Sequence, residues 1–237
     1  MIPLPQPQKF TSRLASIEKV SSKVYIERFE LIEPKEITFL PGQTVMLYIA
    51  PGVNRAMSIA SPPSEKTSIT LAHDVSPMGS YSKWAISAKA GDQMQFMGPL
   101  GNFVAYKESP RRKVFVATGT GIAPFRSMIL DMPLETMTLY WGLRHEEDIF
   151  WQKEFEELSH TYTNFRFVLT LSQPTENWQV SASRRRGYVG DHLFADEKNL
   201  PGTDFYLCGN KNMITDMRTR LKAAGVPDTQ VKFELFY

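Results

Sequence analysis

Residues 114–125 read VFVATGTGIAPF, and this stretch decides the fold of the chain's second half. Its first five residues form a continuous apolar run, which is typical of a strand buried on both faces of a parallel sheet. The glycines that follow allow the backbone to approach a phosphate, and a helix that begins there offers free N–H groups and the positive end of its dipole. The stretch therefore predicts a strand, a phosphate-binding turn and a helix.

The glycine pattern differs from the usual dinucleotide-binding fingerprint. Pro124 stands at the third glycine position, where the first turn of a helix tolerates proline. The acidic residue expected about 20 positions further on is absent, because residues 140–144 read YWGLR. By itself the pattern also fits a tight strand-to-helix turn that binds nothing.

Downstream of this stretch, apolar runs alternate with helical patterns. Between residues 212 and 223, Met213, Met217 and Leu221 share one helical face, and Gly225 follows as a stop signal. This alternation predicts a doubly wound α/β domain with a parallel sheet over residues 109–237. The further strands are expected at 137–141, 165–171 and 204–209.

Upstream of this stretch, the spacing of apolar runs and turn signals is different. Short runs rich in β-branched and aromatic residues are separated by turn signals such as Pro41-Gly42 and Pro51-Gly52, which predicts an antiparallel barrel or sandwich. One helix is expected at 81–89. A polar stretch at 105–112 suggests the domain boundary, which we set between 108 and 109. The strands are expected at 23–31, 44–50, 68–75 and 93–98.

Composition excludes several classes of protein. The chain has 237 residues, 42% of them hydrophobic and 22% charged, as in a folded globular protein. A net charge of +2 is too mild for nucleic-acid binding, and the basic cluster Arg184–Arg186 is interpreted as a solvated loop. No apolar run approaches the length of a membrane span. The proline-containing N-terminus is interpreted as a loose leader and not a signal peptide, so a cytoplasmic location is expected.

The chain has a single cysteine, Cys208. One cysteine cannot form an internal disulfide and falls short of the ligands that a structural zinc site or a [2Fe–2S] cluster usually needs. No metal site is therefore expected, and single-electron chemistry would require an organic cofactor.

Two motifs in the first half carry polar groups suited to an anion. Arg55-Ala56-Met57-Ser58 contains an arginine that could hold a phosphate, and Gly79-Ser80-Tyr81-Ser82 opens the expected helix. Each alone also fits a structural role, as an exposed arginine at a strand end or a helix cap.

Combined with the glycine turn, Cys208-Gly209 and the terminal Glu234-Leu235-Phe236-Tyr237, these two motifs resemble the ferredoxin–NADP⁺ reductase superfamily. That superfamily includes the reductase components of bacterial oxygenases and the flavin reductases.

The resemblance runs in the family's motif order from about residue 10 to the end. It implies a Greek-key β-barrel domain that binds FAD over residues 1–108 and an NAD(P)-binding α/β domain over 109–237. On the barrel, Ser58 would hydrogen-bond the N5 edge of the flavin. The implied FAD ligands are Arg55, Ala56, Met57, Ser58, Gly79, Ser80 and Ser82. Met57 stands where the family usually has Tyr or Phe, and Met78 replaces a glycine, so FMN is the less favoured alternative.

The second half would bind the nicotinamide cofactor. The implied cofactor loop consists of Thr118, Gly119, Thr120, Gly121 and Pro124. Cys208 and Gly209 would lie near the nicotinamide C4, with Glu234 close by. Phe236 would cover the outer face of the flavin, and Tyr237 could share that role. Arg144 is a candidate ligand for the 2′-phosphate of NADPH, although NADH-using relatives can also have an arginine at this position. Ser172, Arg186 and Tyr188 resemble the NADP-type pattern, although Gln173 replaces an arginine; NADPH is slightly favoured over NADH.

The expected function is a flavin-dependent oxidoreductase. A hydride would pass from NAD(P)H to bound FAD, and electrons would then pass to a separate acceptor such as a ferredoxin, a flavodoxin or an oxygenase component. One alternative is an NAD(P)H:flavin reductase that releases free reduced flavin, because residues 139–151 resemble that branch as well. Another is a non-catalytic electron-transfer subunit of a larger complex. The oligomeric state stays open, and a monomer is compatible with the sequence.

Overall fold

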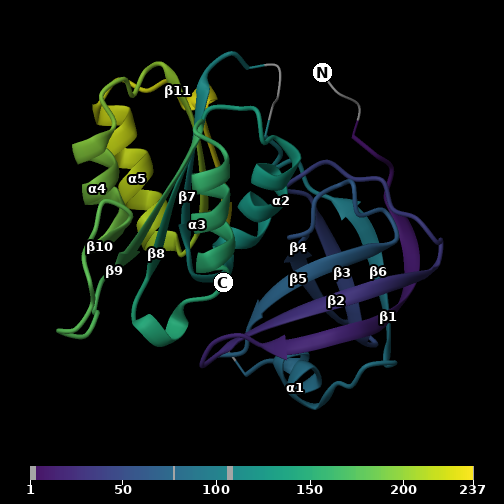
Figure 1. Ribbon diagram of the computed structural model, residues 1–237. Helices are drawn as coiled ribbons and strands as arrows, with labels where there is room; N and C mark the ends of the chain where they lie inside the picture. Colours follow the sequence, from purple (N-terminus) through teal and green to yellow (C-terminus); the bar gives the residue numbers. More distant parts are fainter. Residues whose placement is uncertain (1–3, 77, 106–108, 237) are drawn as a thin grey trace. The chain divides into compact units, whose positions relative to one another are not determined.

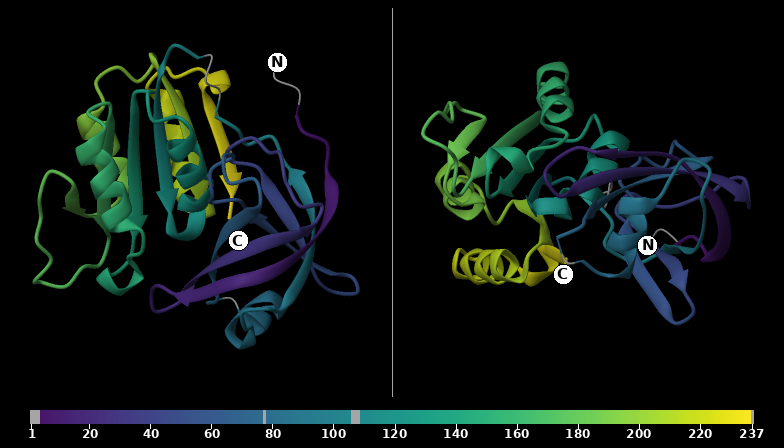
Figure 2. Two further views of the ribbon diagram at one scale, coloured as in Figure 1. Left: turned by 45° about the vertical axis from the view of Figure 1, so that its right-hand side comes forward. Right: turned by 90° about the horizontal axis from the view of Figure 1, so that it is seen from below.

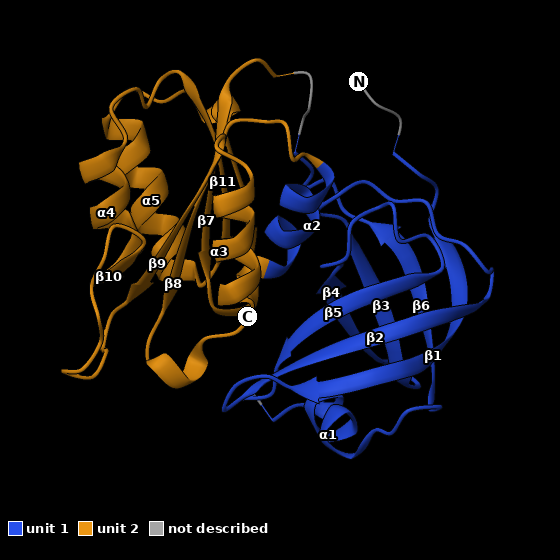
Figure 3. Ribbon diagram, viewed as in Figure 1, with its two compact units in different colours: residues 1–105, 123–131 blue, residues 106–122, 132–237 orange. Residues whose placement is uncertain are grey.

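A computed structural model describes residues 4–76, 78–105 and 109–236. The chain forms two compact units (Figure 3). Unit 1 comprises residues 1–105 and 123–131, and unit 2 comprises residues 106–122 and 132–237. Helix α2 (Ala123–Asp131) thus groups with unit 1, although the flanking sequence belongs to unit 2. The boundary expected between 108 and 109 involves residues 106–108, which lie outside the described part, and it stays a proposal.

Unit 1 is built on a curled antiparallel sheet, as the turn-separated runs predicted (Figures 1 and 2). The strand order is β4-β3-β6-β1-β2-β5, so β4 and β5 form the two edges. Helix α1 (Ser80–Ser87) falls where a helix was expected and follows β5 directly in sequence. The strands are β1 (Gln8–Lys19), β2 (Val24–Glu33), β3 (Thr44–Ala50), β4 (Val53–Ser58), β5 (Ser68–Asp74) and β6 (Gln93–Leu100).

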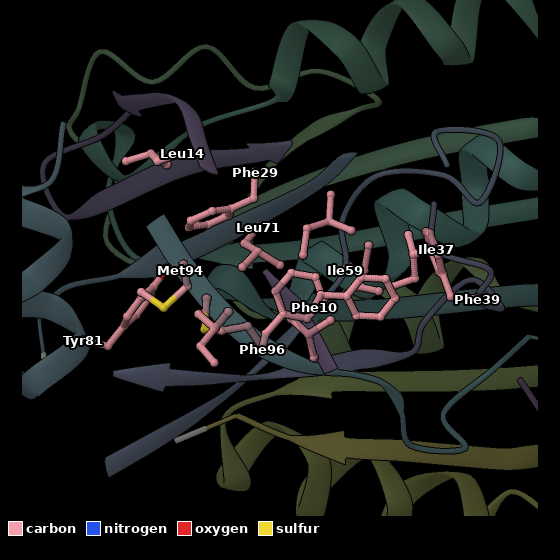
Figure 4. Close-up of a cluster of buried hydrophobic side chains, with 14 residues drawn as sticks. Phe10, Leu14, Phe29, Ile37, Phe39, Ile59, Leu71, Tyr81, Met94 and Phe96 are labelled. Carbon is pink, nitrogen blue, oxygen red and sulfur yellow. The ribbon is translucent and has the colours of Figure 1, made fainter. Parts of the chain in front are cut away.

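Aliphatic and aromatic side chains together fill the core of unit 1 (Figure 4). Phe10 on β1 and Phe96 on β6 stack with ring centroids 5.0 Å apart. Trp84 of α1 stacks on Phe29 of β2 at 6.1 Å and on Tyr81 at 5.4 Å. These contacts pack α1 against β2 of the sheet.

Unit 2 is a parallel sheet of order β10-β9-β8-β7-β11-β12 with helices on both faces. On one face, Leu193 of α4 and Met217 of α5 pack with Val116 and Val168 of the sheet. On the other, Phe155 of α3 contacts the rings of Phe165 and Phe167. This confirms the doubly wound α/β expectation. The elements are β7 (Arg112–Thr118), η1 (Gly119–Ile122), β8 (Met137–Leu143), η2 (Glu146–Asp148), α3 (Gln152–Thr161), β9 (Phe165–Leu171), β10 (Arg184–Arg186), α4 (Val189–Asp196), β11 (Thr203–Gly209), α5 (Lys211–Ala223), η3 (Asp228–Gln230) and β12 (Val231–Leu235).

The interpretation of Arg184–Arg186 as a solvated loop is wrong. These residues form the edge strand β10, which pairs in parallel with β9. Arg184 donates to the Glu156 carboxylate at 3.0 and 2.8 Å, and Arg185 donates to Asp196 at 3.0 Å. The basic cluster is therefore held by ion pairs from neighbouring helices.

Within the described residues, helices are too short and too polar to cross a membrane.

Candidate cofactor sites

The Arg55–Ser58 motif lies on the edge strand β4 and pairs with β3. Arg55 is half-buried and Ala56 is exposed, whereas Met57 and Ser58 are buried. Along this strand the arginine side chain is therefore partly exposed at the surface, whereas the serine side chain is buried.

The start of helix α1 fits an anion. Gly79 is the N-cap in extended conformation (φ −82°, ψ −179°), and as a glycine it has no side chain with which to cap the first turn. Gly79 and Ser80 are exposed, and the first turn contains no acidic residue. The leading N–H groups of a helix have no partner within it, so they and the dipole can bind a phosphate here.

A buried polar network lies behind this helix start. Ser82 Oγ is 2.9 Å from Nε2 of His73 on β5, and Tyr81 donates its hydroxyl hydrogen to Oε2 of Glu27 on β2 at 2.6 Å. Burial, followed by the charge of Arg55, lowers the pKa of His73 to about 4. Ser82 thus contacts His73, and Arg55 lies close enough to His73 to influence its pKa.

Sequence reasoning missed Glu27 and gave His73 no role. Glu27 shares the inward face of β2 with Phe29, and both are fully buried. Burial raises the pKa of Glu27 to about 8, against the lowering effect of the Tyr81 hydrogen bond. The signal in the sequence is an acidic residue at an inward position of an alternating strand.

In unit 2, the candidates for the nicotinamide cofactor gather at the carboxyl edge of the parallel sheet, where ligands of such sheets usually bind. Cys208 of β11 pairs with Ala117 of β7 on one side and with Glu234 of β12 on the other. Just beyond, the Phe236 N–H donates to the Gly209 carbonyl at 2.9 Å. Tyr237 lies outside the described residues.

The glycine turn packs directly on β11. A Cβ added to Gly121 would lie 2.4 Å from the Cys208 carbonyl oxygen, so only glycine fits without movement of the backbone. Gly119 has φ +57°, and its carbonyl accepts a hydrogen bond from Trp141 Nε1 at 3.0 Å. Thr120 is half-buried in η1 between these glycines. Pro124 lies in the first turn of α2, as expected for its residue type.

Asn210 is a residue that the motifs did not reveal. Its backbone N–H and Nδ2 donate to Thr118 Oγ1 at 2.9 and 3.1 Å, and its Oδ1 accepts from the Met213 N–H at the start of α5. It therefore ties the ends of β7 and β11 together while capping a helix. An asparagine directly before a helical pattern is an N-cap signal that could have identified it.

The Cys208 thiol is fully buried. Burial, and then the charge of Glu234, raise its pKa well above the ordinary value. The sulfur is consequently neutral across the physiological range.

The NADP-type candidates lie at the ends of neighbouring strands. The Ser172 N–H donates to the Leu143 carbonyl at 3.0 Å, which places the end of β9 beside Arg144 at the end of β8. Arg186, on β10, donates to the carbonyls of Thr175 and Glu176 at 2.9 and 3.0 Å. Tyr188 is the N-cap of α4 and is 71% exposed. The structure brings these four candidates to one edge of the sheet.

Known proteins share both halves of this architecture. A family model for the oxidoreductase FAD-binding domain matches residues 11–105, and one for the oxidoreductase NAD-binding domain matches residues 115–219. The chain is 32% identical to ferredoxin–NADP reductase B of Sorangium cellulosum (strain So ce56), over 98% of this chain and 99% of that one. It is 27% identical to reductase component 1 of the terephthalate 1,2-dioxygenase of Comamonas sp., over 92% of this chain and 66% of the relative.

Solved structures share the fold. The cytochrome P450 reductase GcoB of Amycolatopsis has a TM-score of 0.89 at 24% identity, over all of this chain and 72% of that one. A ferredoxin NADP⁺ reductase of Neisseria gonorrhoeae, solved with bound FAD and NADP, has a TM-score of 0.81 at 19% identity, over 98% and 100% of the two chains.

The chain belongs to the ferredoxin reductase-like superfamily and is an oxidoreductase with an FAD-binding and an NAD-binding domain. The resemblance inferred from the motifs is thereby confirmed, together with the enzyme class and the cofactors. The roles assigned to single residues stay predictions.

Proposed function

We propose that this chain takes a hydride from NADPH and passes electrons one at a time to a small, separate redox protein such as a ferredoxin, a flavodoxin or an oxygenase component. The observation that carries the proposal is the match to ferredoxin–NADP reductase B along nearly the full length of both chains.

The residues of unit 1 would hold FAD. The backbone N–H groups at the start of α1, with Arg55 of β4, would provide donors for a pyrophosphate. Ser58 would hydrogen-bond the reactive edge of the flavin ring. When bound, FAD supplies the chemistry that accepts a hydride and returns its two electrons singly.

The residues of unit 2 would hold and orient the nicotinamide cofactor. The closely packed turn Gly119–Gly121 offers backbone N–H groups to its pyrophosphate. Cys208 would face the nicotinamide as a neutral thiol beside Glu234, and Phe236 would cover the flavin until the nicotinamide takes its place.

The preference for NADPH rests on Arg144, which is exposed at the end of β8. Arg144→Ala should raise the KM for NADPH about tenfold or more, because a charged hydrogen bond to the 2′-phosphate is lost, while the KM for NADH changes little. Equal effects on both cofactors would show that Arg144 does not recognise this phosphate.

One experiment tests the function as a whole. FAD-loaded protein is titrated anaerobically with NADPH and with NADH while the visible flavin spectrum is recorded, and oxidised ferredoxin, flavodoxin or free FMN is then added. We expect reduction by NADPH and reoxidation by a redox protein with FAD retained. Loss of FAD on dialysis, with turnover of added FMN or riboflavin, would instead identify a flavin reductase. Folded protein that refuses both FAD and FMN would contradict the proposal.

A further inference from the structure

Thr118, a proposed ligand of the nicotinamide cofactor, is held by the connection between β11 and α5. Its Oγ1 accepts one hydrogen bond from the Asn210 backbone N–H at 2.9 Å and another from Asn210 Nδ2 at 3.1 Å. A threonine hydroxyl has two lone pairs and one hydrogen, so these two donors occupy both of its acceptor positions. What the Thr118 hydroxyl can still offer to a ligand is its hydrogen.

The side-chain amide of Asn210 has a defined orientation. Its Oδ1 accepts a hydrogen bond from the Met213 backbone N–H at 2.9 Å, which makes Asn210 the N-cap of α5. Because a backbone N–H can only donate, the amide oxygen must face Met213 and the amide nitrogen must face Thr118. The amide therefore donates to the threonine oxygen and cannot accept the threonine hydrogen.

Two glycines on the neighbouring strands leave room for the Thr118 side chain. A Cβ added to Gly209 of β11 would lie 2.1 Å from Thr118 Oγ1, and one added to Gly142 of β8 would lie 3.5 Å from Thr118 Cγ2. Because threonine is stiff about χ1, contacts with both its hydroxyl and its methyl group fix where the oxygen lies. The half-buried hydroxyl is thus held at the carboxyl edge of the sheet, directly before the turn Gly119–Gly121.

We propose that Asn210 is a positioning residue for the nicotinamide cofactor: because Asn210 donates twice to the Thr118 oxygen, the Thr118 hydroxyl can only donate, and its hydrogen binds a pyrophosphate oxygen of the cofactor. Phosphate oxygens near neutral pH are acceptors, so such a hydroxyl is complementary to them. The inference rests on the proposed function, which assigns the pyrophosphate to the turn Gly119–Gly121. It goes further, because it gives Asn210 a role besides capping α5.

The substitution Asn210→Asp reverses this hydrogen bond without removing the helix cap. Aspartate caps a helix about as well as asparagine, so the melting temperature should be little changed. The carboxylate oxygen that faces Thr118 can only accept, so the threonine hydroxyl turns its hydrogen toward this oxygen and away from the cofactor. If Asn210 served only as a cap, the substitution would add a charge and nothing more.

The measurement is the dissociation constant of NADP⁺, and in parallel of NAD⁺, by isothermal titration calorimetry of the FAD-loaded full-length protein. We expect Asn210→Asp to weaken binding of the preferred cofactor about tenfold or more, because a hydrogen bond to a charged group is lost. Thr118→Val should weaken it to a similar degree. Thr118→Ser keeps the hydroxyl and should retain most of the affinity.

Three comparisons separate the hydrogen bond from the added charge. Asn212→Asp places the same charge in the first turn of α5, on an exposed residue that shares no hydrogen bond with Thr118 in the described part of the chain, and should have a clearly smaller effect. In the Thr118→Val background, Asn210→Asp should lose most of its effect, because no threonine hydrogen is left to redirect. Asn210→Ser is neutral and caps the helix but lacks the amide donor, so it should weaken binding about threefold.

The pyrophosphate is tested with ADP-ribose or its 2′-phosphate, the part of the cofactor that lacks nicotinamide. Asn210→Asp should weaken binding of this fragment as much as binding of the complete cofactor, because the fragment keeps the pyrophosphate. A loss confined to the complete cofactor would overturn the inference, since the acceptor would then lie on the nicotinamide.

The other outcomes are equally distinct. The inference is overturned if Asn210→Asp binds the cofactor no more weakly than Asn212→Asp, if its effect is undiminished in the Thr118→Val background, or if Asn210→Ser binds like the wild type. In each of these cases the wild type still binds NADP⁺ or NAD⁺, and the proposed function stands. A folded wild-type chain that binds neither dinucleotide overturns the proposed function itself.

Discussion

At the scale of single residues, the glycine turn after β7 shows how closely two backbones can approach. Gly121 stands against the carbonyl of Cys208, and a Cβ there would also lie 2.8 Å from the Gly209 nitrogen. The motif thus requires glycine for packing inside unit 2, in addition to any role toward a phosphate. Gly119, two residues earlier, has open space around its Cα and needs glycine only for its positive φ.

The pair Gly121→Ala and Gly119→Ala separates these two requirements. Gly121→Ala should lower the free energy of unfolding by about 3 kcal/mol, because backbone must move to admit the methyl group. Gly119→Ala should cost only about 1 kcal/mol, the strain of a left-handed conformation. Urea denaturation followed by tryptophan fluorescence reports on this, since Trp141, Trp151 and Trp178 all belong to unit 2. Equal losses in both variants would show that the backbone contact is not the constraint.

Burial makes a second residue-scale prediction, about Cys208. With its pKa raised by burial and by Glu234, the thiol stays protonated at pH 8, and the thiolate is the reactive form. A thiol-disulfide reagent added to native protein should therefore react only as fast as the protein opens, and promptly in denaturant. Cys208→Ser gives the background, because the chain has no other cysteine. Complete labelling of native protein within minutes would contradict the buried position.

At the scale of elements, helix α1 is joined to the sheet by aromatic stacking and by the Tyr81–Glu27 hydrogen bond. Glu27 holds its proton up to about pH 8 in the folded chain, whereas an unfolded chain releases it near the ordinary value of 4.5. Between these limits the folded state binds more protons, so the contribution of Glu27 to stability falls as pH rises and then levels off.

Glu27→Gln tests this linkage, because glutamine keeps the shape and the acceptor for Tyr81 but does not titrate. The stability of the variant relative to the wild type should improve steadily from about pH 5 to pH 8, by up to roughly 1 kcal/mol per pH unit. Thermal unfolding across this range gives the difference, and the titration of His73 cancels because both proteins share it. Parallel stability curves would mean that Glu27 is ionised in the folded chain.

Sequence patterns predicted most elements but not the contacts between them. Apolar runs and turn signals correctly predicted β3, β5 and β9, because a buried strand leaves its pattern of apolar residues within a few consecutive positions of the sequence. The edge strand β10 was missed, since a run of arginines has no strand pattern and is held by Glu156 and Asp196 from elsewhere. The Glu27–Tyr81 and His73–Ser82 bonds likewise join residues whose pairing depends on the folded sheet.

At the scale of the whole molecule, the chain divides its cofactor-binding groups between two compact units. The proposed FAD ligands on β4 and α1 belong to unit 1, and most of the nicotinamide-cofactor candidates belong to unit 2. Motif order alone could assign the groups to the two halves, because each motif is local in sequence. Asn210, which ties β7 to β11, could not be assigned in this way, since its partner Thr118 lies 92 residues away.

This division predicts two separate footprints in hydrogen exchange measured by mass spectrometry. FAD should slow exchange of the amides in residues 53–58 and 79–83, because the N–H groups at the start of α1 gain acceptors. NADP⁺ should slow exchange in residues 118–122, 143–145 and 172–188, at the carboxyl edge of the parallel sheet.

At about 100 times the Kd, either ligand adds about 2.7 kcal/mol of global stability, so only amides that exchange by local opening distinguish a footprint from general stabilisation. The turn between β1 and β2 serves as the reference, since it carries none of the proposed ligands. Protection of residues 79–83 by NADP⁺ alone, or of residues 118–122 by FAD alone, would assign the two cofactors to the opposite units.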